Sequence, residues 1–420
     1  MAEDNQPFAG IRVVEFGQFV AVPYCGQLLA EGGAHVIKVE SLEGDPNRHM
    51  GEISPNDSRI FISRNRGKHA LPLKLGDPNS KPIMDALIAS TDVVLMNFRP
   101  GLAGKLGLDP TALLKAYPAL IIGEITPFGK EGPDALLAGM DIVVQARSGL
   151  MAAMGRIVDG RPAPGDPVIS DYMAATSLAY GVSSALLRRE RTGAGGIVDV
   201  SLMQSAMALA NNQLIRHEEL DRESHREAMH KIDTQRRDGA PYEDQLASIP
   251  GIRVYAIRNI YFRTYETADG TIAIACASKG LQDRFNEALD LTPPMQSILT
   301  APAETVNRLR RDVEEILRSK VSQHWVRRLN DAGVPVSTVK FPLELFEDEQ
   351  AEANRMFELV EHPSGSIRVL SPHVKMNGEG FSTRPPTKPF ATETRAILAE
   401  LGFSDEKINE FLTQQLTRGE

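Results

Sequence analysis

Residues 11–16, Ile-Arg-Val-Val-Glu-Phe, and residues 35–40, His-Val-Ile-Lys-Val-Glu, are short apolar runs rich in β-branched side chains. Runs of this length and composition predict buried strands. Similar runs recur at 92–98, 120–125 and 196–202. Because helical patterns separate these runs, the sequence predicts an α/β fold of Rossmann-like architecture, with a parallel sheet covered by helices.

The composition is that of an acidic globular protein. Its 420 residues, 42% of them hydrophobic, can bury a large core and indicate two or three domains. The formal charge of -9 gives no reason to expect a nucleic-acid partner, so a polyanionic ligand would need a local basic pocket. Residues 17–23, which follow the first predicted strand, lack the GxGxxG sequence of dinucleotide-binding proteins. We therefore expect no nicotinamide or flavin cofactor.

Cysteine usage and the amino-terminal sequence indicate the compartment. Cys25 and Cys276 are the only cysteines and lack the spacing of metal ligands or of a disulfide framework, so we expect no metal and a reducing compartment. Residues 1–7 do not resemble a signal peptide, and the uncharged runs at 172–187 and 200–215 are short for a membrane span. We expect a cytoplasmic protein with no membrane partner.

A highly charged stretch, residues 216–237, marks the predicted exit from the large domain. A strand pair and two helical patterns then predict a smaller α+β domain. These elements are expected at 259–266, 270–277, 281–290 and 302–320. The expected boundaries are residues 1–220 for the first part of the large domain, 221–325 for the linker and small domain, and 326–420 for the return to the large domain with an extended strap and a last helix.

A carboxylate lies at the predicted start of a long helix. The apolar run Pro167-Val168-Ile169-Ser170 ends in Asp171, and a helix is predicted over 172–191. Backbone N–H groups and the helix dipole would keep such a carboxylate ionised. Asp171 is therefore either a helix N-cap or an oriented nucleophile.

A second carboxylate precedes it in the chain. Asp141 and Gln145 are four residues apart and would share one face of a helix. Near Asp171, Asp141 would orient that carboxylate or exchange protons with it. The alternative is a helix cap with a surface partner.

Basic residues gather near predicted strand ends. A basic run, Arg64–His69, is flanked by Arg48 before it and by Arg99 and Lys105 after it. These groups would hold phosphates through charge-assisted hydrogen bonds, or they form a solvated loop. Asn97 and Arg99 follow an apolar strand, at the edge where α/β sheets bind ligands, although the residues after them would form a turn in any case.

The order of the segments is more specific than any one of them. They are residues 10–16, 33–40, 44–48, 65–68, 97–101, 128–133, 145–151, Asp171, 184–186, 191–193 and 198–202. In this order they resemble the family III CoA-transferases, also called the CaiB/BaiF family, over nearly the whole chain. The resemblance implies an acyl-CoA:carboxylate CoA-transferase with coenzyme A thioesters and a small carboxylic acid as substrates. It also implies a homodimer of two interlocked rings.

The resemblance further implies roles for single residues. Asp171 matches the family's catalytic aspartate, which attacks the thioester, forms a mixed anhydride and then carries CoA as an aspartyl thioester; we expect Asp141 to be the second catalytic residue. Matching positions place several residues at CoA: Gln18, Phe19, Leu73, Asn97, Phe98 and Lys105. Basic residues added to this set are Arg99, Arg48 and Lys68. Ser41 stands where the family often has a basic residue that contacts the nucleotide.

Three other functions are alternatives. An α-methylacyl-CoA racemase shares the fold and the aspartate, but it has a histidine where Met140 stands here, and a thioether cannot carry a proton. A CoA-binding protein without catalysis would keep the basic crevice but would not need a carboxylate at position 171. A nicotinamide dehydrogenase is disfavoured because the glycine fingerprint is missing.

Overall fold

The computed structural model describes residues 5–165, 167–249, 260–291, 301–377 and 380–419. The chain forms two compact units, the first from Met1–Leu214 with Gln350–Glu420 and the second from Ile215–Glu349. The return to the first unit therefore comes at Gln350 rather than at residue 326. The reason is that helix α15 (Ser322–Asp331) and strand β13 (Val336–Thr338) pack in the second unit.

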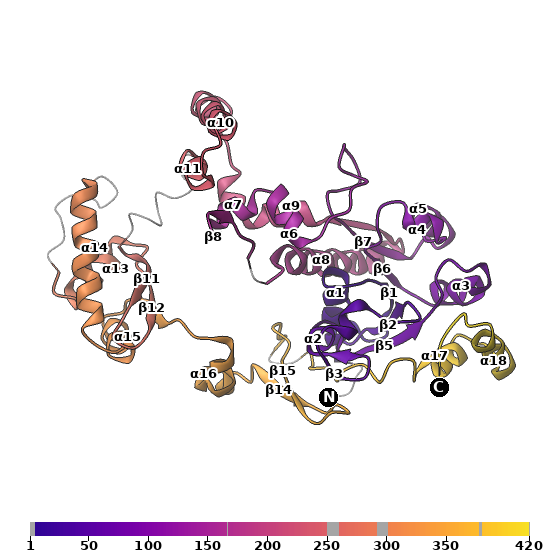
Figure 1. The fold of residues 1–420 in the computed structure, drawn as a ribbon. Helices are drawn as coiled ribbons and strands as arrows, with labels where there is room; N and C mark the ends of the chain where they lie inside the picture. Colours follow the sequence, from indigo (N-terminus) through magenta and orange to yellow (C-terminus); the bar gives the residue numbers. More distant parts are fainter. Residues whose placement is uncertain (1–4, 166, 250–259, 292–300, 378–379, 420) are drawn as a thin grey trace. The chain divides into compact units, whose positions relative to one another are not determined.

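A six-stranded parallel sheet is the centre of the first unit (Figure 1). Across the sheet the strands are β10 (Gly196–Ser201), β7 (Ile121–Thr126), β6 (Val93–Met96), β1 (Arg12–Phe16), β2 (His35–Glu40) and β5 (Lys68–Pro72). The parallel α/β sheet and its five predicted strands are confirmed. Strand β5 was not predicted, because Lys68 and His69 interrupt its apolar pattern.

Helices cover both faces of this sheet. One face packs against α1 (Ala21–Glu31), α6 (Asp141–Arg147), α8 (Ile169–Thr192) and α9 (Leu202–Leu209). The other face packs against α3 (Lys81–Ala89), α5 (Pro110–Ala116), α17 (Thr394–Glu400) and α18 (Asp405–Thr413). Successive residues of β1 alternate between the two cores, Val13 in the first and Val14 in the second.

Short elements complete the first unit. Its short helices include η2 (Pro46–His49), α2 (Arg59–Asn65), α4 (Leu102–Lys105) and α7 (Leu150–Met154). Three antiparallel strand pairs are β3 (Glu52–Ser54) with β4 (Asp57–Ser58), β8 (Ile157–Val158) with β9 (Arg161–Pro162), and β14 (Phe357–Val360) with β15 (Ile367–Leu370). Residues 383–389, predicted as an extended strap, form neither helix nor strand.

The carboxyl-terminal segment covers the outer edge of β5. Leu73 pairs with Thr417 through an antiparallel bridge. The N–H of Lys74 donates to the carbonyl of Leu416 (2.8 Å), and the hydroxyl of Thr417 donates to the carbonyl of Pro72 (2.5 Å). Residues 416 and 417 thus bind the backbone at the carboxyl end of β5, a strand from the first part of the sequence.

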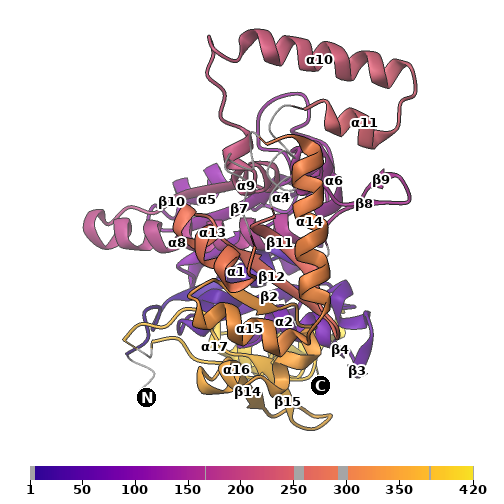
Figure 2. The same ribbon diagram turned by 90° about the vertical axis from the view of Figure 1, so that its left-hand side faces the viewer.

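The second unit is a small α+β structure with a three-stranded antiparallel sheet. Its strands are β11 (Phe262–Glu266), β12 (Thr271–Ala275) and β13, and its packed helices are α13 (Lys279–Ala288), α14 (Ala303–Arg318) and α15. Residue 259, the first residue of the strand predicted at 259–266, lies outside the described residues. The charged stretch forms α10 (Arg222–Arg237), which runs beside α11 (Tyr242–Ala247) in Figure 2. Within the described ranges, no helix has the length and apolar character needed to cross a membrane.

A fully buried carboxylate, Glu15, joins three strands of the large sheet. Its two oxygens accept hydrogen bonds from Lys38 of β2 (3.0 Å) and Lys68 of β5 (2.7 Å). Lys38 also pairs with Asp45 (3.1 Å). Gly26 of α1 makes room for this group, because a Cβ atom there would lie 2.0 Å from a Glu15 oxygen. Removing one member of such a buried pair typically costs about 3–5 kcal/mol, because the partner charge stays buried.

Gly26→Ala is expected to lower the free energy of unfolding by roughly 1–3 kcal/mol, the usual cost of overpacking. The clash falls on a Glu15 side chain that two lysines hold in place, so it cannot be relieved by rotation. Urea denaturation would measure the change.

The matched control is Gly280→Ala, at a helical glycine of α13 with no atom within 4 Å of the new Cβ. It should leave the stability unchanged or raise it by up to about 1 kcal/mol, as helix propensity predicts. Equal stability of the two variants would contradict the packing argument.

Candidate active site

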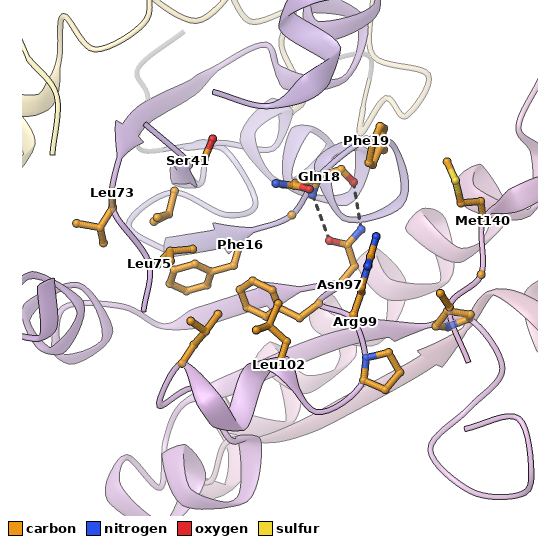
Figure 3. A pocket seen from close by; sticks show the side chains of 18 of the residues that line it. Phe16, Gln18, Phe19, Ser41, Leu73, Leu75, Asn97, Arg99, Leu102 and Met140 are labelled. Carbon is orange, nitrogen blue, oxygen red and sulfur yellow. Dashed lines mark hydrogen bonds between the residues drawn. The ribbon is translucent and has the colours of Figure 1, made fainter. Parts of the chain in front are cut away.

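A cleft of about 810 Å³ opens at the carboxyl ends of the sheet strands (Figure 3). The chain runs outward from β1 through β2 to β5 and then crosses to β6 on the other side, so β1 and β6 flank the point where strand order reverses. Ligands of open α/β sheets bind at such a switch point. The volume suits a cofactor-sized ligand.

Most residues predicted to contact CoA line this cleft: Gln18, Phe19, Leu73, Asn97, Phe98 and Arg99. In Figure 3, Leu73 and Leu75 lie toward one end, and Phe19 and Met140 lie toward the other. Lys105 is exposed on α4 between two leucines of the cleft wall, Leu102 and Leu106, but its own side chain is not part of that wall.

Arg48 and Lys68 do not reach the cleft. Arg48 is 1% exposed, and its guanidinium donates two hydrogen bonds to Glu40, each 2.7 Å long. Lys68 is 2% exposed and is occupied by Glu15. We therefore remove both from the proposed CoA contacts. A sequence shows that a residue is basic, but it does not show that a buried carboxylate already neutralises it.

The sequence analysis did not identify several residues of the cleft wall, among them Lys74, Leu75 and Val143; Ser41, noted there at a nucleotide-contacting position of the family, also lines the cleft. Lys74 follows β5, and its ammonium pairs with Asp77 (3.1 Å). Recognising β5 as a strand would have placed Lys74 at the ligand-binding edge with the other strand ends.

The turn between β1 and α1 is unusually well fixed. Asn97 binds both backbone groups of Gln18: its oxygen accepts from the Gln18 N–H (3.2 Å) and its amide donates to the Gln18 carbonyl (3.1 Å). Figure 3 marks both bonds. The next residue, Phe19, has a φ of 66°, in the left-handed region. This conformation costs roughly 1–2 kcal/mol for a residue with a side chain, so the surroundings must enforce it.

Asp171 lies inside α8 rather than at its cap. The helix begins at Ile169, and the N-cap residue is Val168, which places Asp171 in the first turn. The capping role belongs to Asp141, whose carboxylate accepts from the N–H of Ser170 (2.9 Å). Cross-helix capping of this kind satisfies a backbone donor that the helix itself leaves free.

Asp141 is itself held by Gln145, both residues being buried. The Gln145 amide donates to the second oxygen of Asp141, and its carbonyl accepts from the N–H of Gly165 (3.0 Å). The expected pairing of Asp141 and Gln145 on one helix face is present, but it faces the interior. It ties α6 to the start of α8.

The pKa of Asp171 is raised to about 7, mainly by burial and in part by the neighbouring charge of Asp141, while the charge of Arg64 opposes both effects. This differs from the sequence expectation of a fully ionised carboxylate. The dipole of α8 favours ionisation, but loss of water around the side chain outweighs it. At pH 7 about half of the molecules carry the ionised form.

The surroundings of Asp171 come from several helices. Arg64 of α2 donates to the hydroxyl of Tyr172 (3.4 Å), and the Tyr172 ring meets Tyr24 of α1 edge to face. The cleft wall includes Met140, which directly precedes Asp141. Neither Asp171 nor Asp141 is part of the cleft wall; Asp171 is connected to the Met140 end of the cleft through the hydrogen bond between Asp141 and the Ser170 N–H. A partly ionised, desolvated carboxylate beside such a cleft can attack an electrophilic carbon or transfer a proton.

Comparison with known proteins identifies the family of this chain. A family model described as CoA-transferase family III matches residues 8–391. The chain belongs to CoA-transferase family III. Cinnamoyl-CoA:phenyllactate CoA-transferase of Clostridium sporogenes is 28% identical over 429 residues, covering 98% of this chain and 97% of that protein. The succinyl-CoA–L-malate CoA-transferase beta subunit of Chloroflexus aurantiacus is 28% identical over 426 residues, covering 98% of each.

Solved structures agree with this assignment. A CaiB/BaiF family protein from Brucella suis matches with a TM-score of 0.75 at 27% identity, over 94% of this chain and 100% of that one. This family III CoA-transferase is therefore a transferase whose substrates are CoA thioesters.

The carboxyl group of Asp171 is expected to titrate near pH 7 in carbon-detected NMR, with Asp171→Asn identifying its signal. Arg64→Gln should raise this pKa, because it removes the cation that lowers it. Arg147→Gln, which removes a guanidinium paired with Asp134, is the control and should leave the signal unchanged. An Asp171 pKa near 4 would contradict the burial argument.

Proposed function

We propose that this enzyme moves CoA between an acyl-CoA thioester and a free carboxylic acid through a covalent intermediate on Asp171. The observation that carries the proposal is a half-buried carboxylate with a pKa raised to about 7, connected through Asp141 to the Met140 end of a cofactor-sized cleft in a family III CoA-transferase. The identity of the acyl donor and acceptor is not part of the proposal, since the relatives act on different acids.

The reaction begins with a carboxylate oxygen of Asp171. It attacks the thioester carbonyl carbon, the C–S bond breaks, and CoA thiolate leaves a mixed anhydride behind. The thiolate then attacks the aspartyl carbon of the anhydride, which releases the first carboxylate and forms an aspartyl-CoA thioester. The acceptor carboxylate repeats both steps in reverse order, and Asp171 is regenerated with no net gain or loss of protons.

The environment of Asp171 suits this chemistry. Burial removes water that would shield the nucleophile and would later hydrolyse the anhydride. A raised pKa lowers the ionised fraction, yet about half remains ionised at pH 7. The ionised form is the reactive one.

Asp141 acts through its hydrogen bond to the Ser170 N–H in this proposal. It fixes the first turn of α8, and so the direction in which the Asp171 side chain leaves the helix. Its charge also contributes to the raised pKa of Asp171. We therefore assign Asp141 a positioning role in place of the catalytic role expected from the sequence.

Asp171→Ala and Asp171→Asn are expected to lower kcat for CoA transfer by about a thousandfold or more, because both remove the nucleophile. Circular dichroism should show an intact fold. Asp134→Ala, which removes a half-buried carboxylate paired with Arg147, is the control and should keep full activity. A folded Asp171→Ala enzyme that still transfers CoA would refute the assignment.

Trapping separates the transferase from its alternatives. Borohydride added with acyl-CoA should reduce the aspartyl thioester to an alcohol, and mass spectrometry should locate the change at Asp171. No adduct would favour a CoA-binding protein without catalysis. Exchange of an α-proton of a branched acyl-CoA in deuterated water, without transfer to any acid, would instead favour a racemase.

We also propose that the enzyme is a homodimer of interlocked chains. Large apolar side chains on α8 support this, since Tyr180 is 76% exposed and Leu187 is 54% exposed in the single chain. Light scattering is expected to give twice the mass of one chain. A monomeric mass at micromolar concentration would exclude the dimer.

A further inference from the structure

The turn over residues 17–19 forms part of the cleft wall, and three polar side chains hold its backbone in place. The ammonium of Lys38 donates to the carbonyl of Gly17 (2.6 Å). The side-chain amide of Asn47 donates to the carbonyl of Phe19 (2.7 Å). Asn97 holds Gln18, which lies between them. Each of the three residues is thus bound by a different side chain.

Asn47 is well placed for this contact because its own backbone cannot move. It lies in η2 and is 2% exposed. Its N–H donates to the carboxylate of Asp45 (2.9 Å), and its carbonyl accepts from the hydroxyl of Ser58 (2.6 Å). The side-chain amide is therefore a fixed donor.

The contact is connected to the buried charges below the turn. Asp45, which holds the Asn47 backbone, pairs with Lys38, the same lysine that binds the Gly17 carbonyl. Lys38 in turn pairs with Glu15 in the centre of the sheet. The geometry of the cleft wall at Phe19 is thereby set by residues that do not line the cleft.

Phe19 needs such a constraint. Its φ of 66° is rare for a residue with a bulky side chain, and the ring is part of the cleft wall. Without the amide donor, the Phe19 backbone can relax to negative φ, which would turn both the ring and the carbonyl.

We propose that Asn47 is a positioning residue for CoA binding, acting by holding Phe19 in its left-handed conformation. This inference rests on the proposed function, since it assumes that CoA occupies the cleft. Asn47 acts on affinity for the thioester, because the residue that it holds lines the cleft and lies on a different element from Asp171.

The first test is Asn47→Ala, with CoA binding measured by calorimetry. We expect CoA to bind about tenfold more weakly, while kcat at saturating acyl-CoA changes less than twofold and KM for the acid is unchanged. If the alanine variant does not fold, Asn47→Ser is used, since its hydroxyl is too short to reach Phe19. Unchanged CoA affinity in a folded variant would overturn the proposal.

A matched control shows whether general destabilisation is responsible. Asn286→Ala removes another buried amide, which donates to the hydroxyl of Tyr261 (2.9 Å) in the second unit. It should lower thermal stability but leave CoA affinity unchanged. Equal weakening of CoA binding by both asparagine variants would assign the effect to stability and overturn the proposal.

A double-mutant cycle tests whether Asn47 acts through Phe19. Asparagine adopts left-handed φ more readily than phenylalanine, so Phe19→Asn reduces the need for the constraint. In the Phe19→Asn background, Asn47→Ala should weaken CoA binding twofold or less. A tenfold loss in both backgrounds would overturn the proposed route. Failure of the unaltered enzyme to bind CoA would instead refute the proposed function.

Discussion

The buried pairing of Glu15 with two lysines is the constraint on which the rest of the large unit depends. A single carboxylate in the central strand holds Lys38 from one neighbouring strand and Lys68 from the strand beyond it. Burial lowers the pKa of Lys68 to about 8; the charge of Glu15 opposes this effect, and the charge of Lys38 adds to it. The network joins Glu15 of β1 and Lys38 of β2 to the first residue of β5, and so fixes the relative position of the three strands.

Asp141 and Asp171 have different roles, and the difference depends on where α8 begins. Asp141 satisfies the Ser170 N–H from another helix, which frees Asp171 from any capping role. Asp171 is then left desolvated near a second negative charge, and its pKa rises accordingly. The hydrogen bond from the Ser170 N–H to Asp141 thus positions the helix and brings a second negative charge, which adds to the effect of burial on the pKa of Asp171.

Sequence reasoning predicted the sheet well because buried parallel strands are continuous apolar runs. Val93–Met96 is such a run, and it has no other plausible structure. Lys68–Pro72 was missed for the opposite reason, since its first two residues are polar and only the folded structure supplies their partners. The choice of Gln18, Asn97 and Phe98 for the cleft came from the family resemblance and agrees with the cleft wall.

Other features could not be predicted, because they depend on contacts between residues far apart in the sequence. The start of α8 was placed three residues late, because the residue that caps it, Asp141, lies 29 positions earlier in the chain. Arg48 looked like a phosphate ligand because its basic character is visible in the sequence, whereas its two hydrogen bonds to Glu40 are not.

The pairing of residues 416 and 417 with the end of β5 affects how the chain folds during synthesis. Strand β5 is the outermost strand of the sheet, and residues 416 and 417 bind the backbone where it ends. During synthesis, most of the sheet is available long before these residues leave the ribosome. Until then the end of β5 presents unpaired backbone groups, a template for pairing with another chain. The growing polypeptide is therefore exposed to aggregation between the synthesis of β5 and that of residues 416 and 417, which pair with the backbone beside Leu73 and Lys74 of the cleft wall.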